Sequence, residues 1–171
     1  MTPEAQTEIA HLLEESRRDL HAAVEGVTES QAAAKPESGR WSILECVEHV
    51  ATVEQRFLTR LAGAKRLDGP RVDRAREAEF AALIVSRAKP LQAPEAVRPT
   101  GRFATLTSAL EHFDATRSQA VAKTAELGPA LYALEVEHPR FGMLNGTELM
   151  ILLAGHARRH AAQIREIREG S

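Results

Sequence analysis

The chain has 171 residues, enough for one domain with a real hydrophobic core. Its 22 basic and 24 acidic residues give a formal net charge of -2, which offers no support for nucleic-acid binding. The single cysteine, Cys46, excludes an internal disulfide and suits a reducing cytoplasm. No secretory signal or membrane-spanning apolar run is visible. We therefore expect one domain over residues 1–171 in a cytoplasmic protein with no membrane partner.

Two long helices are predicted in the first third of the chain. The first begins near Thr2 or Pro3, since proline suits the first helical position, and its apolar residues keep a helical period to Val27. Ser42 is the expected N-cap of the second, because Glu45 lies three residues on and completes a capping box. This second helix is expected to end near Gly63.

The rest of the chain predicts one short helix and two long ones. The short helix covers residues 72–87, and a proline-rich connection follows over residues 88–102. A long helix over residues 105–127 comes next, then a short extended piece and a turn over residues 132–142. The last helix begins near Asn145. With no strong strand signal anywhere, the pattern predicts an all-α four-helix bundle with a short extra helix.

A histidine pair in the last helix is the clearest chemical signal. His156 and His160 are four residues apart, so they lie on one face of a helix and can grip a divalent ion of the zinc or nickel type. Ala157 stands where a metalloprotease of this pattern carries its general base, so that activity is not expected. The alternative is that both are ordinary polar residues on the flank of the helix.

His49 is the best candidate for a third ligand. It lies at the margin of the apolar stripe of the second helix and needs a partner if buried: a metal, a carboxylate or a backbone carbonyl. Three histidines with open coordination positions are typical of a catalytic metal site. The other histidines are expected outside such a site, with His138 shaping a turn and His11, His21 and His112 at the surface.

Several residues near these histidines have two interpretations. Trp41 is interpreted as a packing anchor in preference to a substrate wall, and Cys46 as a buried apolar-like residue in preference to a ligand. Glu45 serves the capping box or orients an imidazole. Gln163, one turn beyond His160, is placed to face the same cavity. For Arg56, a solvent ion pair is favoured over contact with an anionic substrate, and Glu45, Glu48 and Arg56 are expected near the edge of the buried stripe or outside it.

Several motifs together resemble the DinB-like superfamily: residues 41–49, His138-Pro139, residues 142–144, Glu148 and residues 156–164, with the connection from 89 to 103. The resemblance implies a four-helix bundle with a crossed connection. It also implies a divalent metal, zinc or nickel, held at the positions of His49, His156 and His160. Such proteins are often dimers, and activities named within the superfamily include transfer and isomerisation with low-molecular-weight thiols such as bacillithiol or mycothiol.

Two hypotheses for function follow. The first is a metal-dependent enzyme with a small-molecule substrate, which activates a low-molecular-weight thiol for transfer, or water for hydrolysis. No separate general base lies at motif spacing, which mildly favours the thiol, and the sequence assigns no catalytic residue. The second is a non-catalytic helical binding or dimerisation module with a vestigial metal site. A homodimer is expected, in keeping with the resemblance.

Overall fold

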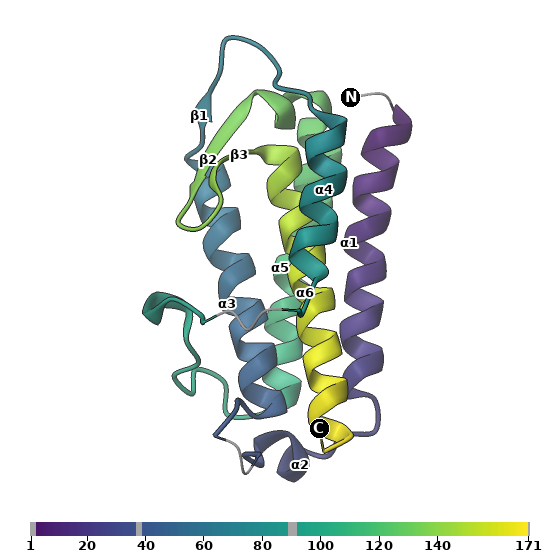
Figure 1. Ribbon diagram of the computed structural model, residues 1–171, viewed down its shortest axis with the longest axis vertical. Helices are drawn as coiled ribbons and strands as arrows, with labels where there is room; N and C mark the ends of the chain where they lie inside the picture. The colour runs from purple at the N-terminus through teal and green to yellow at the C-terminus, as the bar shows by residue number, and fades with distance from the viewer. Residues whose placement is uncertain (1–2, 37–38, 89–91, 171) are drawn as a thin grey trace.

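The computed structural model describes residues 3–36, 39–88 and 92–170, with side chains from residue 7 onward. Four long helices lie side by side and form most of the molecule (Figure 1). They are α1 (Pro3–Val24), α3 (Ile43–Ala62), α5 (Leu106–Leu127) and α6 (Gly146–Arg168). No helix among the described residues combines the length and the apolar character that a bilayer crossing needs. The predicted all-α four-helix bundle is confirmed.

The order of the helices around the bundle is crossed. Helix α1 packs against α5 and α6, and α3 packs against the same two, so α1 lies diagonally across from α3, and α5 lies diagonally across from α6. Helices α3 and α5 run in the same direction, and α6 runs opposite to them (Figure 1). The crossed connection that the resemblance implied is thereby confirmed, and it brings α3 beside α6.

Capping boxes fix where the helices begin, as predicted. The backbone N–H of Glu45 donates to Ser42 Oγ at 3.2 Å, and the N–H of Ser42 donates to the Glu45 carboxylate at 2.8 Å. Asn145 and Glu148 form the same reciprocal pair, both bonds at 2.8 Å. Each box satisfies two backbone donors at the helix start, so these short sequence motifs set the helix ends without help from the rest of the fold.

Two short helices accompany the bundle. Helix α4 (Arg74–Val85) corresponds to the short helix predicted over residues 72–87 and packs against α6. Helix α2 (Glu29–Ala33) was not predicted; Thr28 caps it, and it closes the end of the bundle near the C-terminus (Figure 1). It has only five residues, too few to show a helical period in the sequence.

A small antiparallel sheet lies at the other end of the bundle, with strand order β1-β2-β3. Its strands are β1 (Lys65–Arg66), β2 (Leu134–His138) and β3 (Gly142–Asn145). The extended piece and turn expected over residues 132–142 match β2 and the turn after it, whereas β1 and the sheet as a whole were missed. Strands of two to five residues are too short to show a clear alternation of apolar and polar side chains.

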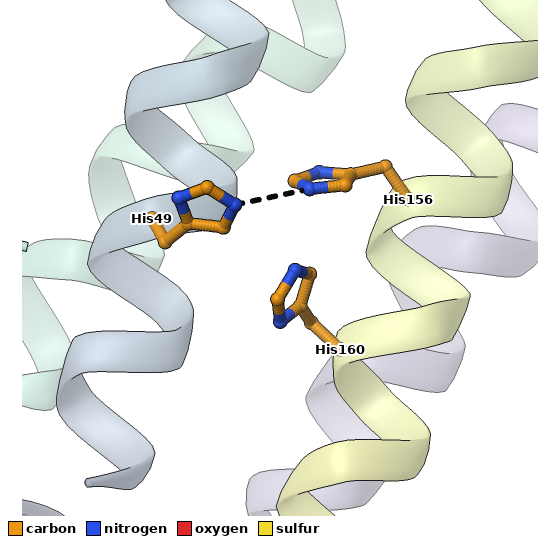
Figure 2. Close-up of side chains that lie close together, drawn as sticks. All are labelled: His49, His156 and His160. Atoms are coloured by element: carbon orange, nitrogen blue, oxygen red, sulfur yellow. Dashed lines mark hydrogen bonds between the residues drawn. The ribbon is translucent and has the colours of Figure 1, made fainter. Parts of the chain in front are cut away.

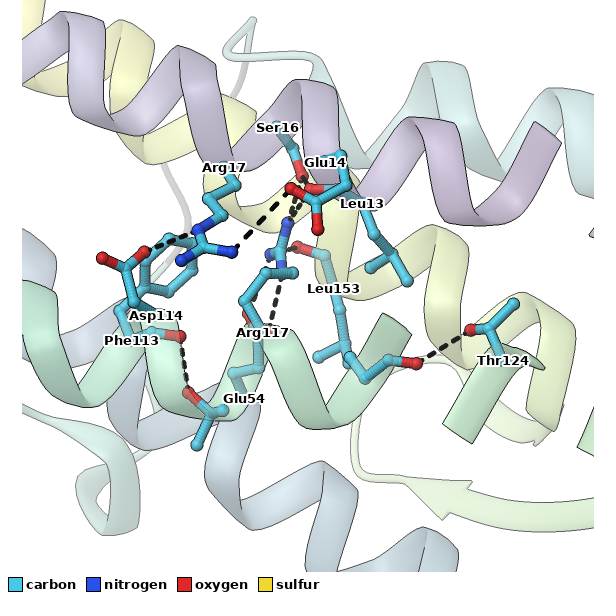
Figure 3. A network of polar contacts seen from close by, with 12 residues as sticks. Leu13, Glu14, Ser16, Arg17, Glu54, Phe113, Asp114, Arg117, Thr124 and Leu153 are labelled. Carbon is cyan, nitrogen blue, oxygen red and sulfur yellow. Dashed lines mark hydrogen bonds and ion pairs between the residues drawn. The ribbon is translucent and has the colours of Figure 1, made fainter. Parts of the chain in front are cut away.

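A buried ion pair crosses the middle of the bundle (Figure 3). Arg117 of α5 donates to both carboxylate oxygens of Glu54 on α3, at 2.7 and 2.8 Å, and neither side chain is more than 1% exposed. The same guanidinium donates to Ser16 Oγ and to the carbonyls of Leu13 at 2.5 Å and Leu153 at 3.3 Å. One arginine therefore joins all four long helices at one level, and nothing in the sequence pattern had singled it out.

Candidate metal centre

Three histidines from two helices converge on one point between α3 and α6 (Figure 2). His49 comes from α3, and His156 and His160 come from successive turns of α6. One ring nitrogen of each lies within 4.8 Å of those of the other two, and Nε2 of His49 lies 3.1 Å from Nε2 of His156. The fold thus brings His49 close to His156, which lies 107 residues further along the chain, as the sequence analysis expected.

The spacing of these nitrogens fits a divalent ion. Metal–nitrogen bonds of about 2.0–2.1 Å in tetrahedral geometry hold two nitrogens about 3.3–3.4 Å apart. The 3.1 Å between His49 and His156 is close to that value, and the widest separation, within 4.8 Å, is one that rotation of a ring can reduce. The cluster has three imidazoles and no carboxylate among the described residues, a donor set that suits a divalent transition metal.

The ring of His49 is oriented by a backbone carbonyl. Its Nδ1–H donates to the carbonyl oxygen of Val97 at 2.6 Å, which leaves Nε2 as the nitrogen with a free lone pair facing His156. Val97 ends a short 3-10 turn, Glu95–Val97, in the proline-rich connection. Of the three partners considered for His49, the carbonyl is therefore the one found at Nδ1. Glu45 does not orient the ring, because its carboxylate binds Ser42 and Lys35.

Burial keeps all three rings neutral. It is the largest cause that lowers the pKa of His49, and it holds the pKa values of His156 and His160 well below the usual range. Charge repulsion from His49 also lowers the pKa values of His156 and His160, and repulsion from His160 lowers that of His156. A hydrogen bond from Gln163, one turn beyond His160 as expected, raises the pKa of His160 and opposes part of the fall. Neutral imidazoles keep the lone pairs that a metal requires.

Trp41 covers one side of the cluster. Its ring lies 4.8 Å from that of His49 and is stacked 6.2 Å from that of His160, measured between ring centroids. The residue directly precedes the N-cap of α3, so the start of that helix fixes its position. Trp41 packs on the imidazoles, as the favoured interpretation expected. The same side chain also limits access to the rings from that side.

Two arginines and one glutamate lie beside the cluster. Arg159 and Arg87 both act on the pKa of His160, and each lowers it. Arg159 is 8% exposed and lies one turn from His156 on α6. Arg87 follows α4 and binds Glu166 of α6 with bonds of 2.7 and 2.5 Å.

Glu48 anchors the connection that carries Val97. Its carboxylate accepts the backbone N–H of Thr100 at 2.6 Å and that of Gly101 at 3.2 Å. The expectation that Glu48 lies near the edge of α3 or outside was wrong, because it is 1% exposed. Two backbone donors compensate the buried charge, and no periodicity rule reveals a partner 52 residues away.

The remaining histidines lie outside the cluster. His138 shapes the turn as predicted: its Nδ1 accepts the N–H groups of Arg140 at 3.1 Å and Phe141 at 3.2 Å. Burial, with the charges of Arg60 and Arg140, lowers the pKa of His138 to about 4. The other three are His11, which is exposed, His21, which binds Asp114 at 2.9 Å, and the partly buried His112.

The structure agrees with the prediction for Cys46 but only partly with that for Arg56. Cys46 is fully buried, as predicted, and burial raises the pKa of its thiol to about 12, so it is not a nucleophile. Arg56 is exposed as predicted, but it makes no ion pair with any described residue. The favoured interpretation of Arg56 as half of a solvent ion pair was wrong.

A crossed four-helix bundle with three histidines converging between two helices is the class of protein that the fold and the site define. The sequence model of the DinB superfamily matches residues 12–164, and the chain belongs to that superfamily.

Two proteins of Bacillus subtilis are similar to this chain. Uncharacterized protein YuaE of strain 168 is 25% identical over 160 residues, which cover 92% of this chain and 96% of YuaE. YfiT is described as a probable metal-dependent hydrolase with an unusual four-helix bundle topology. Its structure matches with a TM-score of 0.64 at 17% identity, over 99% of this chain and 90% of YfiT, a likeness that concerns the fold. The family and the histidine cluster together fit a metal-dependent role.

Proposed function

We propose that this protein is a metal-dependent enzyme that holds a zinc or nickel ion at His49, His156 and His160. The observation that carries the proposal is the convergence of three neutral imidazoles, with two Nε2 atoms 3.1 Å apart and the His49 ring turned by the Val97 carbonyl. With Nδ1 of His49 donating to Val97, the lone pair of its Nε2 points at Nε2 of His156, where a metal ion can replace the proton of the hydrogen bond between the two rings. Three ligands leave coordination positions open for a reactant, as catalytic sites require.

The residues around the cluster have different roles in this proposal. The chemistry that a divalent ion supplies in such a site is Lewis acidity, which lowers the pKa of a thiol or of water. Val97 holds the tautomer of His49, and Trp41 excludes water from one side of the rings. Arg159 and Arg87 supply positive charge that draws an anionic reactant or stabilises negative charge as it develops.

Two nucleophiles compete within this proposal. A low-molecular-weight thiol is supported by the absence of a carboxylate from the described cluster, because a thiol deprotonated by the ion needs no separate general base. Water is supported by the likeness to YfiT, which is described as a probable metal-dependent hydrolase. The first route gives transfer of the thiol to an electrophile, and the second gives hydrolysis of a small molecule.

Metal content tests the site directly. Protein purified without added ions is expected to contain about one zinc or nickel ion per chain by elemental mass spectrometry. The variant His156→Ala should lose most of that metal. His11→Ala is the matched control, because the His11 side chain is 64% exposed and lies on α1. Equal metal content in His156→Ala and in the wild type would remove His156 from the ligand set.

Activity distinguishes the nucleophiles. Metal-loaded protein is incubated with electrophiles in the presence of a panel of thiols, and separately with esters and amides in the absence of thiol. Turnover that requires thiol and disappears in His156→Ala supports transfer, whereas thiol-independent turnover supports hydrolysis. Binding of metal without either activity would favour the alternative function.

The alternative is a non-catalytic binding or dimerisation module with a vestigial metal site. The specific observation in its favour is limited access: His49 is 5% exposed and His160 is 7% exposed, and Trp41 packs against both rings. We also propose a homodimer. Light scattering after size-exclusion chromatography tests this, and a molar mass near 18.7 kDa at all concentrations would contradict it.

A further inference from the structure

A cavity beside α3 is lined by none of the three clustered histidines. Its volume is about 280 Å³, and it lies between α3, α5 and the connection that follows α4. Its polar lining includes Gln55 and Arg56 from α3, Arg102 from the connection and His112 from α5. The space is near the lower end of the ~300–1,000 Å³ of ligand pockets, so its occupant is a small molecule.

The charged groups that line this cavity are cationic. Arg56 and Arg102 contribute two guanidinium groups, and no carboxylate is found among the described residues that line it. Arg56 makes no hydrogen bond through its side chain to any described residue, and Arg102 makes one, from Nε to Thr100 Oγ1 at 3.3 Å. A guanidinium has five N–H donors, so most of the donors here are available to a ligand.

The cavity also has an aromatic wall. The Phe103 ring lies 5.2 Å from the His112 ring, tilted by 44°, and both residues line the space. No hydrogen bond to a described residue occupies the ring nitrogens of His112. A flat apolar group can therefore rest on Phe103 while an anionic head reaches the two arginines and His112.

The wall formed by the connection is held in place independently of any ligand. Glu48 accepts the N–H groups of Thr100 and Gly101, which directly precede Arg102. On the other side of the cavity, Ala96 is next to Val97, whose carbonyl binds His49. Arg102 is thus carried on a fixed segment, and Arg56 lines the same cavity from α3, which is the preorganisation that a binding site needs.

We propose that this cavity binds a small phosphate ester, with its phosphate between Arg56 and Arg102 and its organic part against Phe103. A phosphate monoester carries about -1.5 to -2 charges at pH 7, which matches two guanidinium groups better than a singly charged carboxylate does. Arginine also binds phosphate oxygens through two parallel N–H bonds. This binding site is separate from the three histidines and goes beyond the proposed metal-dependent function.

Isothermal titration of the metal-loaded protein with phenyl phosphate at low salt tests the proposal, and benzoate serves as the carboxylate analogue. The wild type is expected to bind phenyl phosphate more tightly than benzoate. The double variant Arg56→Gln/Arg102→Gln should lose at least tenfold in affinity. The control Arg18→Gln/Arg66→Gln removes the same charge from two exposed arginines outside the cavity and should stay within twofold of the wild type.

Four results would overturn the proposal. No saturable binding by the wild type would show that the cavity has no affinity for phosphate esters. Equal losses in the two double variants would show a general effect of net charge, and no loss in Arg56→Gln/Arg102→Gln would place the ligand elsewhere, including at the metal. Benzoate binding as tight as phenyl phosphate would contradict the assignment to phosphate. Both arginines are exposed, so neither variant should unfold, and thermal melting checks this.

Discussion

Replacing Arg117 with methionine should destabilise the protein more than any comparable surface change. The guanidinium makes both bonds to the Glu54 carboxylate and also binds the carbonyls of Leu13 and Leu153. With the arginine gone, a carboxylate that is 1% exposed is left without a counter-charge. Removing one partner of a buried ion pair costs about 3–5 kcal/mol, a large part of the roughly 5–15 kcal/mol that stabilises a typical domain.

The loss should depend on pH. Burial already raises the pKa of Glu54 above its usual value, and the bonds from Arg117 oppose that rise. In Arg117→Met the opposition is gone, so the folded protein holds a proton on Glu54 at a pH where the unfolded chain has released it. Stability then falls as pH rises above about 4.5, because the folded state binds more protons than the unfolded state. The deficit relative to the wild type should be smaller at pH 5 than at pH 8.

Urea unfolding followed by circular dichroism at pH 5, 6, 7 and 8 measures these free energies. The double variant Arg117→Met/Glu54→Leu removes both charges and should recover most of the loss, since apolar replacement of a whole buried pair is often close to neutral. Arg158→Met is the control; its bond to Glu15 is partly exposed and should be worth less than about 1 kcal/mol. A deficit below 1 kcal/mol at pH 7, or a double variant as unstable as the single one, would refute the reasoning.

Three further predictions concern packing, acid stability and metal. Gly155→Ala places a Cβ 2.7 Å from Ile84 Cγ2, so α4 must shift and urea unfolding should show a loss of about 1–3 kcal/mol; unchanged stability would contradict the close contact. His138 has a pKa of about 4 in the folded protein, and an unfolded histidine has one of about 6.5, so stability should fall as pH drops from 6.5 toward 4. Parallel unfolding curves should show a less steep fall for His138→Gln. Free zinc at a concentration 100 times its dissociation constant should raise the free energy of unfolding by about 2.7 kcal/mol at pH 7.5. The increase should be smaller at pH 5.5, where protons compete for the imidazoles, and absent in His160→Ala.

The elements whose causes are local could be predicted from the sequence. The capping boxes at Ser42 and Asn145 use residues three positions apart, and the helical periods need only a few turns of chain. The pairing of His156 with His160 is equally local, because four residues on a helix always share a face. Strands as short as β1 have no such signature, and they form only because the ends of α3 and α5 meet at one end of the bundle.

The identity of the candidate ligands came from the sequence, through the local pair and a resemblance in which His49 completes the set. Their convergence, however, was decided by the crossed packing that places α3 beside α6. The partners that complete the site are also products of tertiary structure: the Val97 carbonyl lies 48 residues from His49, and the Thr100 amide lies 52 residues from Glu48. Spacing along a chain reports contacts within a helix or turn. Contacts between distant segments depend on which faces are buried together, and that is settled only when the whole core packs.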